Sequence, residues 1–373
     1  MNDRSTGTAA AVPAAPGPVK RWVLGARPRT LAAAAVPVVV GTACGWWFRS
    51  HNGFHGGGIT SFIVQHADLP PGRSIGSPFF LKAHFPAWHL DAGTVAGPGV
   101  VIWWRAVCAL IVALAIQVGT NYANDYSDGI RGTDERRVGP VRLVATGLAS
   151  PKAVKRAAFL SFGIAAVAGL GLAAATTWWL VPIGAVCFAA GWLYTGGPKP
   201  YGYLGMGELF VFLFFGVVAT VGSSYVQFGH LWLNVLPSLV HIQLPFYVYF
   251  DRLLPLWASI AVGLLATALL EANNLRDIAG DVVAGKKTLA VRLGRHRAGW
   301  LYVGSMLGVA VGIVLVGLVR PWAFLAFLAL PLAVPPCRLA LSDAQGRDLL
   351  PMLGATGRLQ LVVGALLTVG ILV

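Results

Sequence analysis

Charged residues are scarce in this sequence, which excludes an ordinary soluble domain. They make up 11% of the 373 residues, while hydrophobic residues make up 56% and the mean hydropathy is +0.70. A soluble domain carries about 25% charged residues. The four cysteines stand singly within apolar runs, which excludes a disulfide framework and a cysteine-based metal site. The turn at 196–199 lacks the spacing of a Walker loop and the Ser or Thr that follows its lysine, so nucleotide hydrolysis is not supported.

Apolar runs long enough to cross a bilayer recur along the chain. A spanning helix needs about 20 predominantly apolar residues. The sequence predicts nine such spans, at 30–48, 101–123, 154–175, 177–195, 207–226, 253–272, 299–319, 321–341 and 356–373. It therefore predicts an all-α, multispanning membrane bundle that forms one domain over residues 21–373. Residues 1–20 are rich in Ala, Pro, Gly and Thr and are expected to be a disordered tail.

The basic residues follow this topology. The net charge of +14 could indicate nucleic acid, but 22 of the 28 Lys and Arg fall on the same side as a cytoplasmic N-terminus. Such a bias is the positive-inside pattern of membrane proteins. We therefore expect a multi-pass protein of the bacterial plasma membrane with its N-terminus in the cytoplasm. Its basic residues are expected to serve membrane topology, and no nucleic-acid partner is expected. Two long connections, near 49–100 and 227–252, would lie outside.

Aspartates cluster at two places on the predicted cytoplasmic side. Asp277 and Asp281 are four residues apart, so on a helix they share a face on which their charges repel. Asn124 and Asp128 have the same spacing at the end of the second span. Carboxylate and amide oxygens are hard ligands, and Mg²⁺ takes one or two carboxylates together with phosphate oxygens and water. The pattern predicts Mg²⁺ and a diphosphate held between two acidic helix ends.

Several residues near these clusters complete the predicted site. Gly129 and Gly132 let the chain turn, which would return Asp134 to the metal. Asp125 lies about 100° around the helix from Asn124 and should matter less. The residues expected to contact the diphosphate are basic: Arg131, Arg142, Lys199 and Lys287. The competing interpretation is that these acids are solvated helix caps and the bases positive-inside anchors.

The same stretches resemble the UbiA-type membrane prenyltransferases, and within them the 1,4-dihydroxy-2-naphthoate polyprenyltransferases of menaquinone synthesis. The segment Asn121-Tyr-Ala-Asn-Asp-Tyr-Ser-Asp128 resembles the first aspartate motif of that family, and Asp277-Ile-Ala-Gly-Asp281 resembles the second. Three shorter stretches add to the resemblance: Ala26-Arg-Pro-Arg-Thr30, Val138-Gly-Pro-Val-Arg142, and Tyr194 to Tyr201 with Gly207-Glu208. Gly132 stands where the wider superfamily usually has the last aspartate of its first motif.

The resemblance implies a fold, a reaction and a site. The helices would enclose a central cavity that opens toward the cytoplasmic side. Mg²⁺ at Asn124, Asp128, Asp134, Asp277 and Asp281 would hold a polyprenyl diphosphate, whose chain is transferred to 1,4-dihydroxy-2-naphthoate with loss of diphosphate and CO₂, giving demethylmenaquinone. Another aromatic acceptor is the alternative within the family. Outside it, a membrane cation transporter could also use paired carboxylates.

Overall fold

The computed structural model describes residues 16–51, 100–133, 141–228 and 250–373, and this part of the chain contains helices and no strand. The spanning elements are α2 (Ala32–His51), α4 (Trp103–Ile130), α5 (Pro151–Ala175), α6 (Leu180–Leu193), the continuous run α7 (Gly207–Val211), η3 (Phe212–Val218) and α8 (Ala219–Phe228), α11 (Leu254–Val283), α12 (Leu289–Val319), η5 (Pro321–Ala333) with α13 (Val334–Leu341), and α14 (Leu350–Leu372). Each of the nine predicted spans corresponds to one of these elements, which confirms the all-α membrane bundle.

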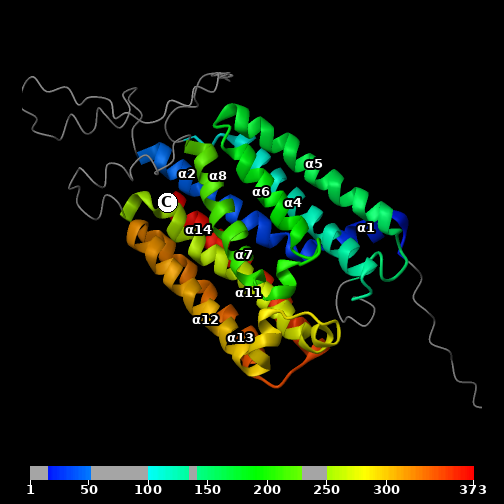
Figure 1. The fold of residues 1–373 in the computed structure, drawn as a ribbon. Helices are drawn as coiled ribbons and strands as arrows, with labels where there is room; N and C mark the ends of the chain where they lie inside the picture. Colours follow the sequence, from blue (N-terminus) through cyan, green and yellow to red (C-terminus); the bar gives the residue numbers. More distant parts are fainter. Residues whose placement is uncertain (1–15, 52–99, 134–140, 229–249) are drawn as a thin grey trace, which may run out of the picture.

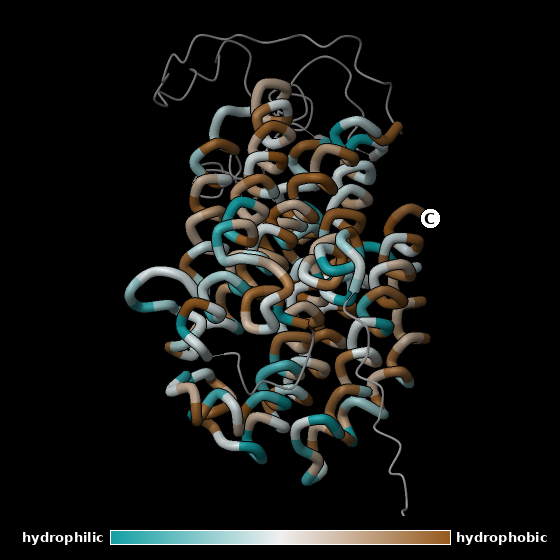
Figure 2. The backbone as a smooth tube through the Cα atoms, turned by 90° about the vertical axis from the view of Figure 1, so that its right-hand side faces the viewer, coloured by the Kyte–Doolittle hydropathy of each residue, from teal (hydrophilic) through white to brown (hydrophobic). Residues whose placement is uncertain are grey.

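Eight of the nine elements are long and apolar enough to cross a membrane. The exception is α6, whose 14 residues reach about 21 Å at 1.5 Å per residue, less than the ~30 Å hydrocarbon core. Hydrophobic residues continue along the length of the helices, and several hydrophilic turns lie at the lower end of the molecule (Figure 2).

The bundle is organised around α11, which packs against α12, α2, α14 and η3. Its residues are apolar over most of the helix, and many are fully buried, including Leu254, Val262 and Leu265. A second group of contacts joins α4 to α5, α2 and α6. In Figure 1, α5 and α12 lie at opposite edges of the bundle.

Glycines allow α2 and α8 to approach closely, as the small-xxx-small spacing of Gly41 and Gly45 predicts. A Cβ at Gly41 would lie 2.2 Å from the backbone oxygen of Thr220, and one at Gly45 would lie 2.6 Å from that of Ser224. Since neither carbonyl can move without disturbing α8, only glycine fits at these two positions.

Short elements stand outside the spans: α1 (Pro18–Ala26), η1 (Pro28–Thr30), η2 (Tyr201–Leu204) and η6 (Gly346–Leu349). Helix α1 was not expected, and it includes the last three residues of the predicted tail; residues 1–15 lie outside the described part. The middle of α1 is tied to the bundle, because Tyr122 on α4 donates a hydrogen bond of 2.8 Å to the Trp22 carbonyl. Most of the two predicted outer connections, 52–99 and 229–249, also lies outside the described residues.

Candidate functional site

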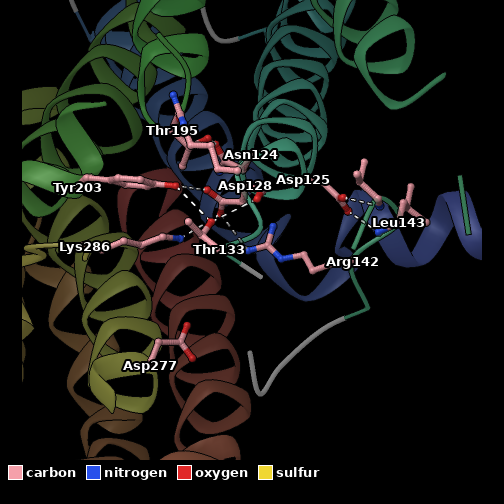
Figure 3. Close-up of polar contacts among 12 residues, drawn as sticks. Asn124, Asp125, Asp128, Thr133, Arg142, Leu143, Thr195, Tyr203, Asp277 and Lys286 are labelled. Atoms are coloured by element: carbon pink, nitrogen blue, oxygen red, sulfur yellow. Dashed lines mark hydrogen bonds and ion pairs between the residues drawn. The ribbon is translucent and has the colours of Figure 1, made fainter. Parts of the chain in front are cut away.

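The two aspartate motifs meet at one end of the bundle. Asn124 and Asp128 lie on the last turns of α4, Asp277 and Asp281 on the last turns of α11, and Lys286 on the turn that follows α11. The Lys286 ammonium lies 3.3 Å from Asp128 Oδ2, which joins the segment after the second motif directly to the first motif. Figure 3 shows side chains from both segments converging on Asp128.

Asp128 is 1% exposed and is surrounded by donors. The Tyr203 hydroxyl donates a hydrogen bond of 2.5 Å to its Oδ1, and Arg142 Nη2 lies 3.7 Å from its Oδ2. Burial, followed by the charge of Asp128, raises the pKa of Tyr203 above its ordinary value, so the phenol stays protonated and can donate. The Lys286 ammonium also lies 4.7 Å above the Tyr203 ring. One carboxylate thus organises two cations and a phenol.

Asn124 is held by the segment after α6. Its Oδ1 accepts a hydrogen bond of 2.7 Å from the Thr195 hydroxyl. Arg131, at the end of α4, donates to the backbone oxygens of Thr195 and Gly197, which fixes the same segment. These contacts turn the amide oxygen of Asn124 toward the cavity side of α4, where it lies with Asp128.

Asp125 faces a different direction from Asp128 and holds a neighbouring backbone segment. Its two oxygens accept hydrogen bonds from the backbone N–H groups of Leu143, at 2.7 Å, and Val144, at 3.0 Å. In Figure 3 it points away from the group around Asp128. By holding residues 143 and 144, Asp125 places the neighbouring Arg142 beside Asp128.

The second motif is divided between two environments. Asp281 lines the same cavity as Asp128 and accepts a contact of 3.5 Å from the Thr288 hydroxyl. Asp277, one turn earlier on α11, is paired with Arg276 through two contacts of 2.7 Å and lies apart from the Asp128 group in Figure 3. Its carboxylate is therefore directed at the neighbouring guanidinium.

The predicted basic residues differ in their placement. Arg142 is 6% exposed and near Asp128. Arg131, Lys199 and Lys287 are exposed, and Arg131 bonds backbone oxygens. Lys286 takes the buried position that the sequence analysis favoured for Lys287, whose backbone N–H donates to the Tyr203 carbonyl instead. Asp134 lies outside the described residues.

Sequence reasoning missed Tyr203, Thr195 and Asn273. Thr195 directly precedes the Gly-Gly-Pro-Lys-Pro turn and Tyr203 lies three residues after it. The turn drew attention to this segment but did not indicate which of its side chains face the site. Asn273 lines the cavity. It precedes Asp277 by four residues, as Asn124 precedes Asp128, and this repeated Asn–Asp spacing could have indicated it from the sequence.

The oxygen donors at this site suit a divalent cation. Within the described ranges, no three His, Cys, Asp or Glu side chains gather as a metal cluster. Mg²⁺ does not require one, because it binds through one or two carboxylates, waters and substrate phosphates. Asp128, Asp281 and the Asn124 amide line one cavity and supply such oxygens. The residues present fit the ion when a phosphorylated ligand completes its shell.

The cavity that these residues line has a volume of about 1750 Å³. Beyond the charged end its walls are mainly apolar, and they include a row of aromatic rings in which Tyr201 and Phe210 stack at 4.1 Å between centroids. The fold and the site define a multispanning helical membrane protein with a large apolar cavity that ends in a charged site.

Comparison with known proteins gives the family. The model of the UbiA prenyltransferase family matches residues 88–348. The chain is 40% identical to a 1,4-dihydroxy-2-naphthoate octaprenyltransferase of Mycobacterium tuberculosis, over 94% of this chain and 96% of that protein. It is 32% identical to the Escherichia coli protein of the same name, over 93% and 92% respectively. The chain therefore belongs to the UbiA prenyltransferase family.

A solved structure of a UbiA homolog from Archaeoglobus fulgidus bound to DMAPP and Mg²⁺ is also similar. It is 14% identical, with a TM-score of 0.44, and the match covers 93% of this chain and 99% of that one.

Proposed function

We propose that this protein transfers a polyprenyl group from a polyprenyl diphosphate to 1,4-dihydroxy-2-naphthoate, releasing diphosphate and CO₂ and forming the quinol of demethylmenaquinone. The names of its relatives support the acceptor. The observation that carries the proposal is the convergence of both aspartate motifs on one cavity, with Lys286 at 3.3 Å from Asp128. An apolar cavity with a charged end suits a long apolar chain that carries a diphosphate.

Asn124, Asp128 and Asp281 would hold Mg²⁺, with Asp134 and Asp277 as further proposed ligands. When bound, the ion supplies positive charge to the diphosphate, a role that metals commonly have in phosphoryl chemistry. Lys286 and Arg142 are placed to contact the same diphosphate, and Arg131, Lys199 and Lys287 are proposed as outer contacts. An arginine can bind phosphate through two parallel hydrogen bonds, whereas a lysine acts as a point charge.

The reaction needs no proton acceptor if the naphthoate enters as its carboxylate. The ring carbon that bears the carboxylate attacks the first carbon of the prenyl chain, whose C–O bond breaks with its electron pair leaving on the diphosphate. The bond to the carboxylate carbon then breaks, its electrons restore the aromatic ring, and CO₂ departs. Residues of the protein bind the leaving group, and the aromatic rings along the cavity wall face the developing allylic cation.

The membrane location follows from the donor. Each CH₂ withdrawn from water is worth about 0.8 kcal/mol, so a polyprenyl chain stays in lipid and the enzyme must meet it there. We place the motif end of the bundle on the cytoplasmic side of the cell membrane, because most basic residues fall on that side in the topology.

The test is an assay of the purified protein in lipid with a polyprenyl diphosphate, 1,4-dihydroxy-2-naphthoate and Mg²⁺. We expect equal amounts of diphosphate, measured by a phosphate assay, and prenylated quinol, measured by mass spectrometry. The Asp128→Ala variant should form no product. Cation flux into vesicles without diphosphate release would support the transporter alternative and contradict the proposal. Product from other aromatic acceptors at equal rates would contradict the naphthoate assignment.

A further inference from the structure

Glu208 is a buried carboxylate that the reaction above does not use. It lies in the first turn of α7 and is 8% exposed. Its Oε1 accepts a hydrogen bond of 2.8 Å from Asn274 Nδ2, while its Oε2 is buried without a hydrogen-bond partner among the described residues. An unsatisfied buried carboxylate oxygen reduces stability. Ionisable residues within spanning segments are usually retained for function.

The contact with Glu208 determines how Asn274 is oriented. A carboxylate oxygen accepts hydrogen bonds, so the Asn274 amide nitrogen must face Glu208. The amide oxygen, Oδ1, is then turned away from Glu208. Asn274 also lines the cavity. The pair therefore presents a fixed hydrogen-bond acceptor to the cavity from α11.

The surroundings of Asn274 combine aromatic faces with the charged site. The short helix that carries Glu208 also carries Phe210, whose ring stacks on Tyr201 and lies 5.9 Å from that of Phe214, and all three rings line the cavity. Along α11, Asn274 precedes Asp281 by seven residues, which is about 10 Å along a helix axis. The cavity thus contains this acceptor together with an aromatic surface and the residues assigned to diphosphate.

We propose that Asn274 Oδ1 accepts a hydrogen bond from a ring hydroxyl of the aromatic substrate, and that Glu208 is a positioning residue that fixes the amide. The inference rests on the proposed function. Of the groups that the two substrates bring, the prenyl chain has no donor, and the ionised diphosphate and carboxylate only accept. The ring hydroxyls are the substrate groups that can donate to Asn274.

The experiment compares 1,4-dihydroxy-2-naphthoate with the two analogues that each lack one hydroxyl. The wild type should prefer the dihydroxy acceptor to one of them by about tenfold or more in kcat/KM. Asn274→Leu should lower kcat/KM for the dihydroxy acceptor by a similar factor. Its kcat/KM for the analogue that the wild type disfavours should stay within about twofold of the wild-type value, and the KM of the prenyl donor should not change. Asn274→Ala serves the same purpose if the leucine variant does not fold.

Glu208 is tested by a conservative pair. Glu208→Gln keeps an oxygen that accepts from Asn274 and should keep the preference, whereas Glu208→Leu should lose it. Ser305→Ala is the control, because it removes another buried hydrogen bond of α11, that of 2.9 Å to Glu271, and should leave the preference unchanged.

The outcomes separate the inference from the function on which it rests. If the wild type forms no product from 1,4-dihydroxy-2-naphthoate, the proposed function fails. If the wild type forms it but the Asn274 variants lower transfer to all three acceptors equally, or raise the KM of the donor, the assignment of Asn274 is overturned. Loss of preference in Ser305→Ala would equally overturn it, since a general effect on α11 would then explain the result.

Discussion

Neighbouring aspartates on α4 have different tasks. Asp128 faces the cavity among Lys286, Arg142 and Tyr203, whereas Asp125 accepts two backbone hydrogen bonds from the segment at 143–144. Replacing Asp128 by Asn removes the charge at the proposed diphosphate site, and we expect kcat/KM to fall by about a hundredfold or more. Asp125→Asn keeps an acceptor oxygen and should retain most of the activity. Steady-state assays of both variants check this, and equal losses would contradict the division.

Lys286 and Lys287 form a matched pair for testing the cation at the site. The Lys286 side chain is 6% exposed and contacts Asp128, while the Lys287 side chain is exposed. Lys286→Ala should lower kcat/KM for the prenyl diphosphate by about a hundredfold, because it removes a buried charge from the anion site. Lys287→Ala should change it by less than about threefold. A larger loss of kcat/KM in the Lys287 variant than in the Lys286 variant would mean that the exposed Lys287 side chain binds the diphosphate.

At the residue scale, sequence reasoning could name the acidic residues at the meeting of α4 and α11 but not every cation near them. Spacing of four residues places Asn124 with Asp128, and scarcity of acids made the two clusters visible. The choice between two adjacent lysines depends on the path of the turn after α11, in which Gly285 has a φ of +69°. Tyr203 gave no signal of its own, since its role comes from the approach of η2 to the end of α4.

At the element scale, the spans were predictable but their ends were not. The predicted spans at 101–123 and 253–272 stop before Asn124 and Asp277, whereas α4 continues to Ile130 and α11 to Val283. Hydropathy marks the part of a helix that lies in hydrocarbon, while backbone hydrogen bonding continues into the polar region. Both motifs therefore lie on helices. Hydropathy also did not predict α1, because its nine residues are too few to form a membrane span.

The packing of α2 on α8 gives a prediction about an element pair. Gly41→Ala would place a Cβ 2.2 Å from the Thr220 carbonyl, and overpacking of this kind costs about 1–3 kcal/mol. We expect a lower midpoint of thermal unfolding in detergent. Gly163→Ala on α5 is the control, because a Cβ there meets nothing within 4 Å, and its midpoint should not fall. A similar decrease in both variants would mean that helix packing is not the cause.

At the scale of the whole molecule, the site exists because two distant parts of the chain end together. Asp128 and Lys286 are 158 residues apart in sequence, yet their side chains are in contact. Asp281 and Asn124 line the same cavity from α11 and α4. Sequence alone indicated the same side of the membrane for both motifs through the basic residues, but the contact itself depends on how α4, α2 and α11 pack.

This convergence predicts that inorganic diphosphate binds only together with a divalent cation. Without the metal, diphosphate would meet the carboxylates of Asp128 and Asp281, whose negative charges oppose it. Mg²⁺ held by both carboxylates would offset that repulsion. Calorimetry on the purified protein should show diphosphate binding with Mg²⁺ and none after chelation. Asp281→Asn should raise the Mg²⁺ concentration needed for half-maximal binding by about tenfold, while Asp125→Asn should leave it unchanged. Equal binding with and without Mg²⁺ would mean that Lys286 and Arg142 suffice, and that the aspartates orient those cations without holding a metal.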